Sequence, residues 1–251
     1  MMTRPGKARW ALIIAALALL EGACRLGFVS RQTIIAPTAM AAGAWQALGS
    51  AEMRGHILIT LASVAQSIGL AIVVGFAVGA ALYRLPRLRR TLDPFLASYY
   101  AVPAFVFYPV FIVLFGLNRW PLVAIGFVFA VTAVIINTLD GLSRVPRGVR
   151  RTAAVMKLTP LQHIFFIMLP AAAPWLFTGA KFAVVYSFIG VIAGEFVLSG
   201  AGLGHAIAFA YNSFDNATMY GLMLLLFLIV GGINMQLWIW EQRLYARRGG
   251  Y

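Results

Sequence analysis

Long runs of apolar residues separated by short, basic, polar stretches dominate the chain. We predict six membrane-crossing helices, at residues 10–29, 57–83, 95–116, 122–139, 172–198 and 217–240. Each apolar run is close to the roughly 20 residues that a bilayer-spanning helix needs. The pattern therefore predicts an all-α membrane protein with six transmembrane helices.

The composition supports a membrane protein. Of the 251 residues, 62% are hydrophobic and 11% are charged, against about 25% charged residues in soluble domains. The chain has 20 Lys and Arg against 7 Asp and Glu. In a soluble protein this excess would indicate nucleic acid. Here the basic residues lie between apolar spans, so we attribute them to membrane topology and expect no nucleic-acid partner.

The distribution of basic residues predicts the orientation. With a cytoplasmic N-terminus, 15 of the 20 Lys and Arg residues fall in the cytoplasm. The exceptions are Arg25, Arg31, Arg54 and Arg119 outside, and Lys181 within a span. The positive-inside rule therefore predicts that both termini are cytoplasmic. Residues 1–9 form a cytoplasmic tail in this reading, and residues 10–251 form one transmembrane domain.

The first apolar run could also be read as a cleaved signal, because Cys24 ends a Gly-Ala-Cys trio. A lipoprotein cleavage site needs an apolar residue before that trio, and this chain has Glu21. The run is also long for the core of a signal. We therefore expect an uncleaved first helix, with Glu21 and Arg25 paired one helical turn apart near the outer surface.

One long loop, at about residues 140–171, combines positive charge with an amphipathic segment. Thr159 and Pro160 can serve as the N-cap and the first-turn proline of a short helix. The apolar residues of that helix follow at i, i+3, i+4 and i+7, namely Leu161, Ile164, Phe165 and Met168. A cytoplasmic loop with one apolar stripe indicates contact with a soluble partner.

Several motifs stand in a fixed order between roughly residues 55 and 245. They are Asn-Thr-Leu-Asp-Gly-Leu at 137–142, Ile-x-Leu-Pro at 167–170, Gly-Glu-Phe at 194–196 and Gly-Leu-Gly at 202–204. Together they resemble the permease subunits of binding-protein-dependent ABC importers. The most similar branch is the one for nitrate, sulfonate, taurine and thiamine precursors.

The resemblance implies that the long loop docks on a cytoplasmic ATPase. The coupling residues that it implies are Arg150, Arg151, Ala153, Lys157, Leu169 and Pro170. The family usually has Glu, Ala and Gly where this chain has Arg151, Thr152 and Lys157. Two interpretations remain open, namely drift within a loop of unchanged shape, or a transporter that pairs this chain with a second, different permease.

The resemblance also implies a type I ABC importer permease fold in a bacterial inner membrane. The implied partners are two copies of an ATPase, a periplasmic solute-binding protein, the lipid bilayer and a second permease chain, the same or different. The sequence contains no G-x-x-x-x-G-K-[ST] motif. We therefore expect no enzyme activity and no cofactor on this chain, with ATP and Mg bound by the ATPase.

Six residues are candidates for the translocation path, namely Tyr99, Tyr100, Pro103, Phe107, Lys181 and Glu195. Pro103 interrupts the third predicted helix and frees backbone carbonyls at membrane depth. The aromatic residues around it could form a gate or could simply pack. Lys181 is an intramembrane charge, for which a structural or gating role competes with contact to the solute. Glu195 could line the path or cap local backbone.

Two other classes of membrane protein remain as alternatives. A secondary transporter would need inverted repeats and intramembrane acids as ion sites, and we find neither apart from Glu195. A non-transporting scaffold would not need the proline-broken third helix. No Ser-His-Asp, metal or paired-carboxylate constellation can be assembled on one side of the membrane. We therefore predict the permease subunit of an importer for a small solute.

Overall fold

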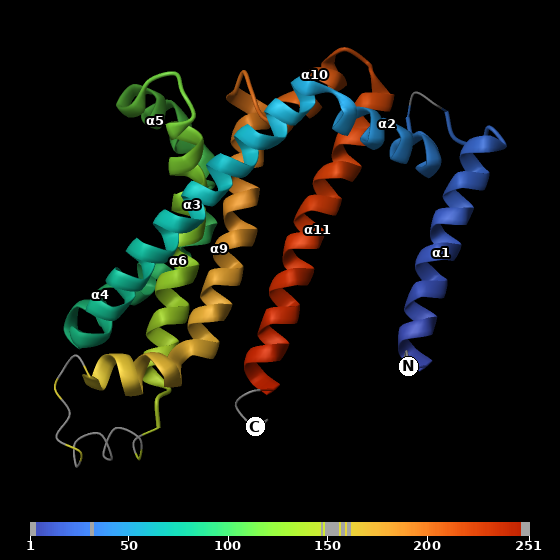
Figure 1. Ribbon diagram of the computed structural model, residues 1–251. Coiled ribbons are helices and arrows are strands. Elements are labelled where there is room, and N and C mark those ends of the chain that lie inside the picture. Colours follow the sequence, from blue (N-terminus) through green and yellow to red (C-terminus); the bar gives the residue numbers. More distant parts are fainter. Residues whose placement is uncertain are drawn as a thin grey trace. The chain divides into compact units, whose positions relative to one another are not determined.

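Every secondary-structure element in the part of the chain that the structure describes is a helix (Figure 1). The computed structural model describes residues 4–30, 33–146, 148, 156, 159 and 162–246. The elements are α1 (Arg4–Arg25), α2 (Pro37–Gly49), α3 (Ala51–Arg84), α4 (Pro86–Ser98), η1 (Tyr99–Ala101), η2 (Ala104–Phe107), α5 (Tyr108–Phe115), α6 (Trp120–Ser143), η3 (His163–Met168), α9 (Leu169–Leu198), α10 (Leu203–Asn212) and α11 (Asn216–Ala246). The chain forms two compact units, residues 1–59 with 195–230 and residues 60–194 with 231–251.

Four described helical segments are long and apolar enough to cross a membrane. They are Ala51–Arg84, Trp120–Ser143, His163–Leu198 and Asn216–Arg243. They coincide with the second, fourth, fifth and sixth predicted spans, which confirms the all-α membrane fold class. The first predicted span corresponds to α1, which already begins at Arg4, inside the predicted tail. Charges at Arg9, Glu21 and Arg25 leave α1 a shorter uncharged run.

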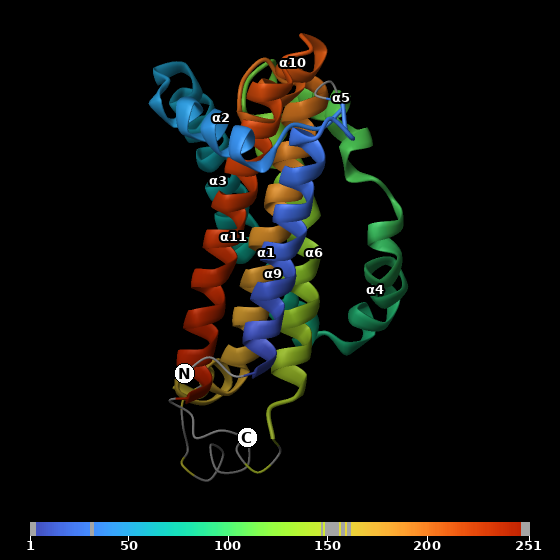
Figure 2. The ribbon, with the colours of Figure 1, turned by 90° about the vertical axis from the view of Figure 1, so that its right-hand side faces the viewer.

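The third predicted span, residues 95–116, is not one continuous helix, and its predicted interruption at Pro103 is confirmed. This segment comprises the end of α4, the short helices η1 and η2, and α5, as Figure 2 shows. Val102 has φ −94° and ψ 119°, the extended conformation that a following proline imposes. Pro103 has φ −65° and ψ 102°, so the chain leaves the helical region for two residues. Pro103 therefore breaks this segment where an apolar pattern alone predicts a continuous helix.

Glycines allow α3, α6 and α9 to approach one another closely within the unit that holds residues 60–194 (Figures 1 and 2). A Cβ atom on Gly75 would lie 2.6 Å from the Cβ of Val134, and one on Gly79 would lie 2.7 Å from the Cβ of Thr138. A Cβ on Gly190 would lie 2.9 Å from the Cα of Gly126. The small-residue pairs of the sequence therefore do bring helix backbones together, as such pairs do in membranes.

A buried hydroxyl reinforces the contact between α3 and α6. The Ser67 hydroxyl lies 2.9 Å from the carbonyl oxygen of Ser63 and 3.0 Å from that of Val123, so it can donate to a carbonyl on either helix. Thr60, Ser63 and Ser67 are fully buried on one face of α3. Polar groups in an apolar medium need internal partners, so this face of α3 is suited to another helix rather than to lipid.

We expect Gly75→Ala to lower the free energy of unfolding by about 1–3 kcal/mol, because the added methyl group must displace Val134. Thermal unfolding of the detergent-purified chain measures this change. Gly69→Ala is the matched control, since a Cβ at Gly69 meets nothing within 4 Å. Equal stability of the two variants would contradict close packing of α3 on α6.

Candidate functional site

The end of the long loop lies directly before α9. Of the six predicted coupling residues, Leu169 and Pro170 begin α9, whereas Arg150, Arg151, Ala153 and Lys157 lie outside the described residues. The predicted cap at Thr159 is confirmed. The Gln162 backbone N–H donates to the Thr159 hydroxyl at 3.4 Å, and the Thr159 N–H donates to the Gln162 side-chain oxygen at 2.9 Å. This reciprocal pair is a capping box.

The segment η3 is a π-helix, and this changes which side chains face outward. Pro170 has no N–H for an α-helical bond to the carbonyl of Phe166, where its ring would also clash. A wider π turn before α9 is suited to that proline. Met168 is buried and Ile164 is half-buried, but Phe165 and Phe166 are 61% and 69% exposed. Phe165 of the predicted stripe is therefore exposed, where a partner could contact it, and Phe166 is a second exposed aromatic residue that the sequence analysis missed.

The start of α9 is held firmly against the end of α6. Met168 and Ala172 form a buried cluster with Leu142 and Val145. The Arg144 guanidinium lies over the Trp175 ring, 4.3 Å from its centre, a favourable cation–π contact. A force applied to η3 would therefore reach both α9 and α6.

The interrupted third span brings two of the predicted path residues together. Tyr99 and Phe107 both line a small cavity of about 280 Å³. The Tyr99 hydroxyl donates to the Val128 carbonyl oxygen of α6 at 2.7 Å. Pro103 lies between them in the chain as the residue before η2. Their place in a path stays a prediction, as does that of Tyr100, whose side chain lies outside the described part.

Lys181 forms an ion pair that the sequence analysis did not foresee. Its ammonium nitrogen lies 2.7 Å from a carboxylate oxygen of Glu241, and the two side chains are 28% and 16% exposed. The pair joins α9 to α11. A lone acid near the end of an apolar helix was the available signal, because charges at membrane depth usually find a partner. In this conformation the Lys181 charge is neutralised within the chain.

Glu195 lies fully buried beside the start of α10. Its carboxylate accepts a hydrogen bond from the backbone N–H of Gly204 at 2.9 Å, and anions are favoured at helix N-termini. Gly202 has φ +105° and donates its N–H to Nδ1 of His56 at 2.9 Å. Glu195 and His56 thus hold the turn before α10. The hydrogen bond from Gly204 to Glu195 agrees with the second of the two roles considered for Glu195, in which it caps nearby backbone.

The next turn uses a second acid. Phe214 has φ +56°, and Asp215 then accepts a hydrogen bond from the Thr218 backbone N–H at 3.1 Å at the start of α11. The hydrogen bonds from Thr218 lower the pKa of Asp215 below its ordinary value. The carboxylate therefore stays charged and caps the N-terminus of α11 at neutral pH.

No group of three or more His, Cys, Asp or Glu residues that could hold a metal ion occurs within the described ranges.

Comparisons with known proteins agree on one family. The family described as binding-protein-dependent transport system inner membrane component matches residues 71–248. The bicarbonate transport system permease protein CmpB of Synechococcus elongatus is 30% identical over 156 residues, which cover 62% of this chain and 56% of the relative. The nitrate import permease protein NrtB of Leptolyngbya laminosa is 30% identical over 162 residues, 64% and 58% of the two chains. These matches span little more than half of each relative's length.

Two further proteins extend the comparison. The formylaminopyrimidine transport permease protein ThiX of Halalkalibacterium halodurans is 26% identical over 174 residues, 69% of this chain and 70% of the relative. A chain of the MetNI methionine ABC transporter, solved in an inward-facing conformation, superposes with a TM-score of 0.67 at 22% identity. That superposition covers 76% of this chain and 94% of the MetNI chain. The likeness shows that the folds are the same.

We expect Gly202→Ala to destabilise the chain by about 3 kcal/mol or more, because φ +105° is strained for any side chain and the added methyl group would overlap the carboxyl group of Glu195. The rate of hydrogen exchange of the backbone amides in α10 should also rise in this variant. Gly200→Ala is the control, because nothing lies within 4 Å of a Cβ at that position. Unchanged exchange in Gly202→Ala would show that Glu195 does not hold this turn.

We expect Lys181→Met to lower the free energy of unfolding by about 1–3 kcal/mol, because it leaves the carboxylate of Glu241 half-buried without its partner. The double variant Lys181→Met, Glu241→Met should recover most of that loss, since no unpaired charge remains. Thermal unfolding of the wild type, of the single variants Lys181→Met and Glu241→Met and of the double variant measures both effects. If the two single substitutions are additive, the pair does not exist in the folded protein.

Proposed function

The chain belongs to the family of inner-membrane components of binding-protein-dependent transport systems, and on that premise we propose that it is the transmembrane permease subunit of an ATP-driven importer. The observation that carries the proposal is the extent of the family match. Residues 71–248 include all of α6, α9 and α11 and the whole of the long loop. The match therefore covers the segments that the proposed mechanism uses.

The proposed complex contains two permease chains, two copies of a cytoplasmic ATPase and a solute-binding protein. ATP and Mg would bind to the ATPase, because this sequence has no phosphate-binding loop of the G-x-x-x-x-G-K-[ST] type. The second permease chain is either a copy of this one or a different permease. Both termini and the long loop are cytoplasmic in the proposal, in line with the distribution of Lys and Arg.

In the proposed mechanism, closure of the ATPase pair moves the loop, and Leu169 and Pro170 pass this movement to α9. Two contacts support this route. The cluster of Met168 and Ala172 with Leu142 and Val145 ties the start of α9 to α6, and Arg144 stacks on Trp175 across the same junction. Because these residues are packed, η3 cannot move far without moving both helices.

The proposed path passes along the interrupted third span. Pro103 interrupts helical hydrogen bonding at that depth, and freed carbonyls are tolerated in membranes where they line a cavity or are buried by neighbours. Tyr99, Tyr100 and Phe107 would form its wall. Lys181 would contribute to transport by holding α11 in place, and Glu195 by holding α10 in place.

The proposed cargo is a small solute. The relatives are named for bicarbonate, nitrate and formylaminopyrimidine, which are all small molecules. In the proposal, such a path would have an aromatic wall and would pass a Lys181 whose charge Glu241 neutralises.

We expect the double variant Leu169→Ala, Pro170→Ala to insert into the membrane but to lose its ATPase and its uptake activity, because the rigid start of α9 would no longer meet the partner. The tagged chain is pulled gently from its own membranes, and native mass spectrometry counts the ATPase copies that it retains. Wild-type protein should carry two.

Leu117→Ala is the matched control for that experiment. Leu117 is an 88% exposed apolar residue in the turn between α5 and α6, far along the chain from the loop. It should keep both ATPase copies. Full retention of the ATPase by the Leu169, Pro170 variant would remove these residues from the coupling assignment, and no ATPase on the wild-type chain in repeated mild extractions would overturn the importer itself.

A further inference from the structure

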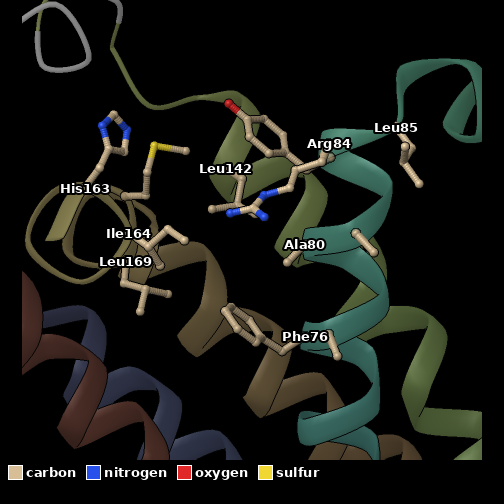
Figure 3. Close-up of a pocket in the computed structure, with 12 residues that line it drawn as sticks. Phe76, Ala80, Arg84, Leu85, Leu142, His163, Ile164 and Leu169 are labelled. Carbon is tan, nitrogen blue, oxygen red and sulfur yellow. The ribbon is translucent and has the colours of Figure 1, made fainter. Parts of the chain in front are cut away.

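A cavity of about 730 Å³ lies where α3 ends, between α3, α6 and η3 (Figure 3). It lies wholly within residues 60–194, one of the two compact units. Its volume falls in the range of small-molecule binding pockets. Its lining residues are Phe76, Ala77, Ala80, Ala81, Tyr83, Arg84, Leu85, Leu142, His163, Ile164, Met168 and Leu169.

The cavity is apolar along its length and basic at one end. Phe76, Ala77 and Ala80 line it on α3, and Leu169 lines it from the start of α9. Figure 3 shows the Arg84 side chain reaching toward Leu142, with His163 on the opposite wall. Phe76 and Arg84 lie about 12 Å apart along the helix at 1.5 Å per residue. No acidic side chain is present among the lining residues.

Arg84 differs from Arg89 and Arg144 in what it contacts. Arg89 donates to the Ser143 hydroxyl at 3.0 Å and lies 3.8 Å from a carboxylate oxygen of Asp93. Arg144 lies over the ring of Trp175. Arg84 is exposed, and no hydrogen bond or ion pair joins it to any part of the chain that the structure describes. Its guanidinium group can therefore take an anion.

The position of Arg84 at the end of α3 indicates which kind of anion it binds. Ala51–Arg84 is an apolar span that ends at Arg84, and Arg87 and Arg90 follow on α4 as further exposed cations. The end of an apolar span that is followed by basic residues lies at the level of the lipid headgroups. A free anion would satisfy Arg84 but would leave the apolar cavity filled with water, which is unfavourable. A molecule with an anionic head and an apolar tail satisfies both.

We propose that this cavity binds an anionic phospholipid of the surrounding membrane, with its phosphate at Arg84 and one acyl chain along Phe76, Ala77 and Ala80. The proposal shares with the proposed function only the placement of the chain in a membrane and does not depend on transport. Because Leu169 lines the same cavity, the lipid would pack against the first turn of α9. The membrane would then stabilise the segment that we assign to ATPase coupling.

The test uses the full chain, purified in detergent and delipidated, without ATPase or solute. Native mass spectrometry follows titration with phosphatidylglycerol and with phosphatidylcholine of identical acyl chains. We expect the first molecule of phosphatidylglycerol to bind at least about fivefold tighter than phosphatidylcholine. A preference of this size corresponds to the binding energy that one basic residue near the headgroups contributes. Arg84→Gln should remove that preference. Arg90→Gln, an exposed cation outside the cavity, should keep it.

Two further arms test the apolar part of the site. Ala77→Phe fills the cavity from an exposed position and should reduce binding of both lipids at least fivefold. Glycerol 1-phosphate, the head without the tail, should not displace phosphatidylglycerol. Thermal unfolding checks that each variant is folded.

The proposal is overturned by equal binding of the two lipids, by equal losses of lipid preference in the Arg84 and Arg90 variants, or by displacement of phosphatidylglycerol with glycerol 1-phosphate. Each of these outcomes leaves the importer proposal untouched, and failure of ATPase retention would leave the lipid result untouched.

Discussion

Close approach of helix backbones at glycine is the constraint on which the rest of this protein depends. Lipid tails are as apolar as leucine, so helices in a membrane gain little from hiding apolar surface from one another. Gly75 and Gly79 let α3 approach α6, and Gly126 and Gly190 let α6 approach α9. These contacts position the start of α9, to which we assign the proposed coupling, and the end of α3, beside which the Arg84 cavity lies.

Several polar side chains between the apolar segments pair within the chain, and they act at places where packing alone would be weak. Lys181 with Glu241 joins α9 to α11, Glu195 holds the start of α10, and Tyr99 ties the interrupted span to α6. In water such contacts would compete with solvent. In an apolar medium their loss leaves a group with no alternative partner. This explains why a chain with so few charges can use single residues to join whole helices.

The sequence predicted well wherever one local pattern had one physical meaning. Apolar runs with few charges gave four of the spans, and Thr159 gave the cap of the loop helix. It was less complete where two local rules competed. The apolar run over residues 95–116 and Pro103 together predicted an interrupted span, but not the two short helices η1 and η2 on either side of the extended residues Val102 and Pro103. The π turn before Pro170 and the exposed Phe166 within it were not predicted.

By itself, then, the sequence determined that the chain lies in a membrane, roughly where it crosses, and which family it resembles, because hydropathy and short motifs are properties of neighbouring residues. Only the tertiary structure decided which distant groups meet. His56 and Gly202 lie 146 residues apart and Lys181 and Glu241 lie 60 residues apart, and no local pattern identifies which distant residue is the partner. The cavity beside Arg84 also depends on tertiary structure. It is the space that remains where α3, α6 and η3 pack together, and no local sequence pattern describes it.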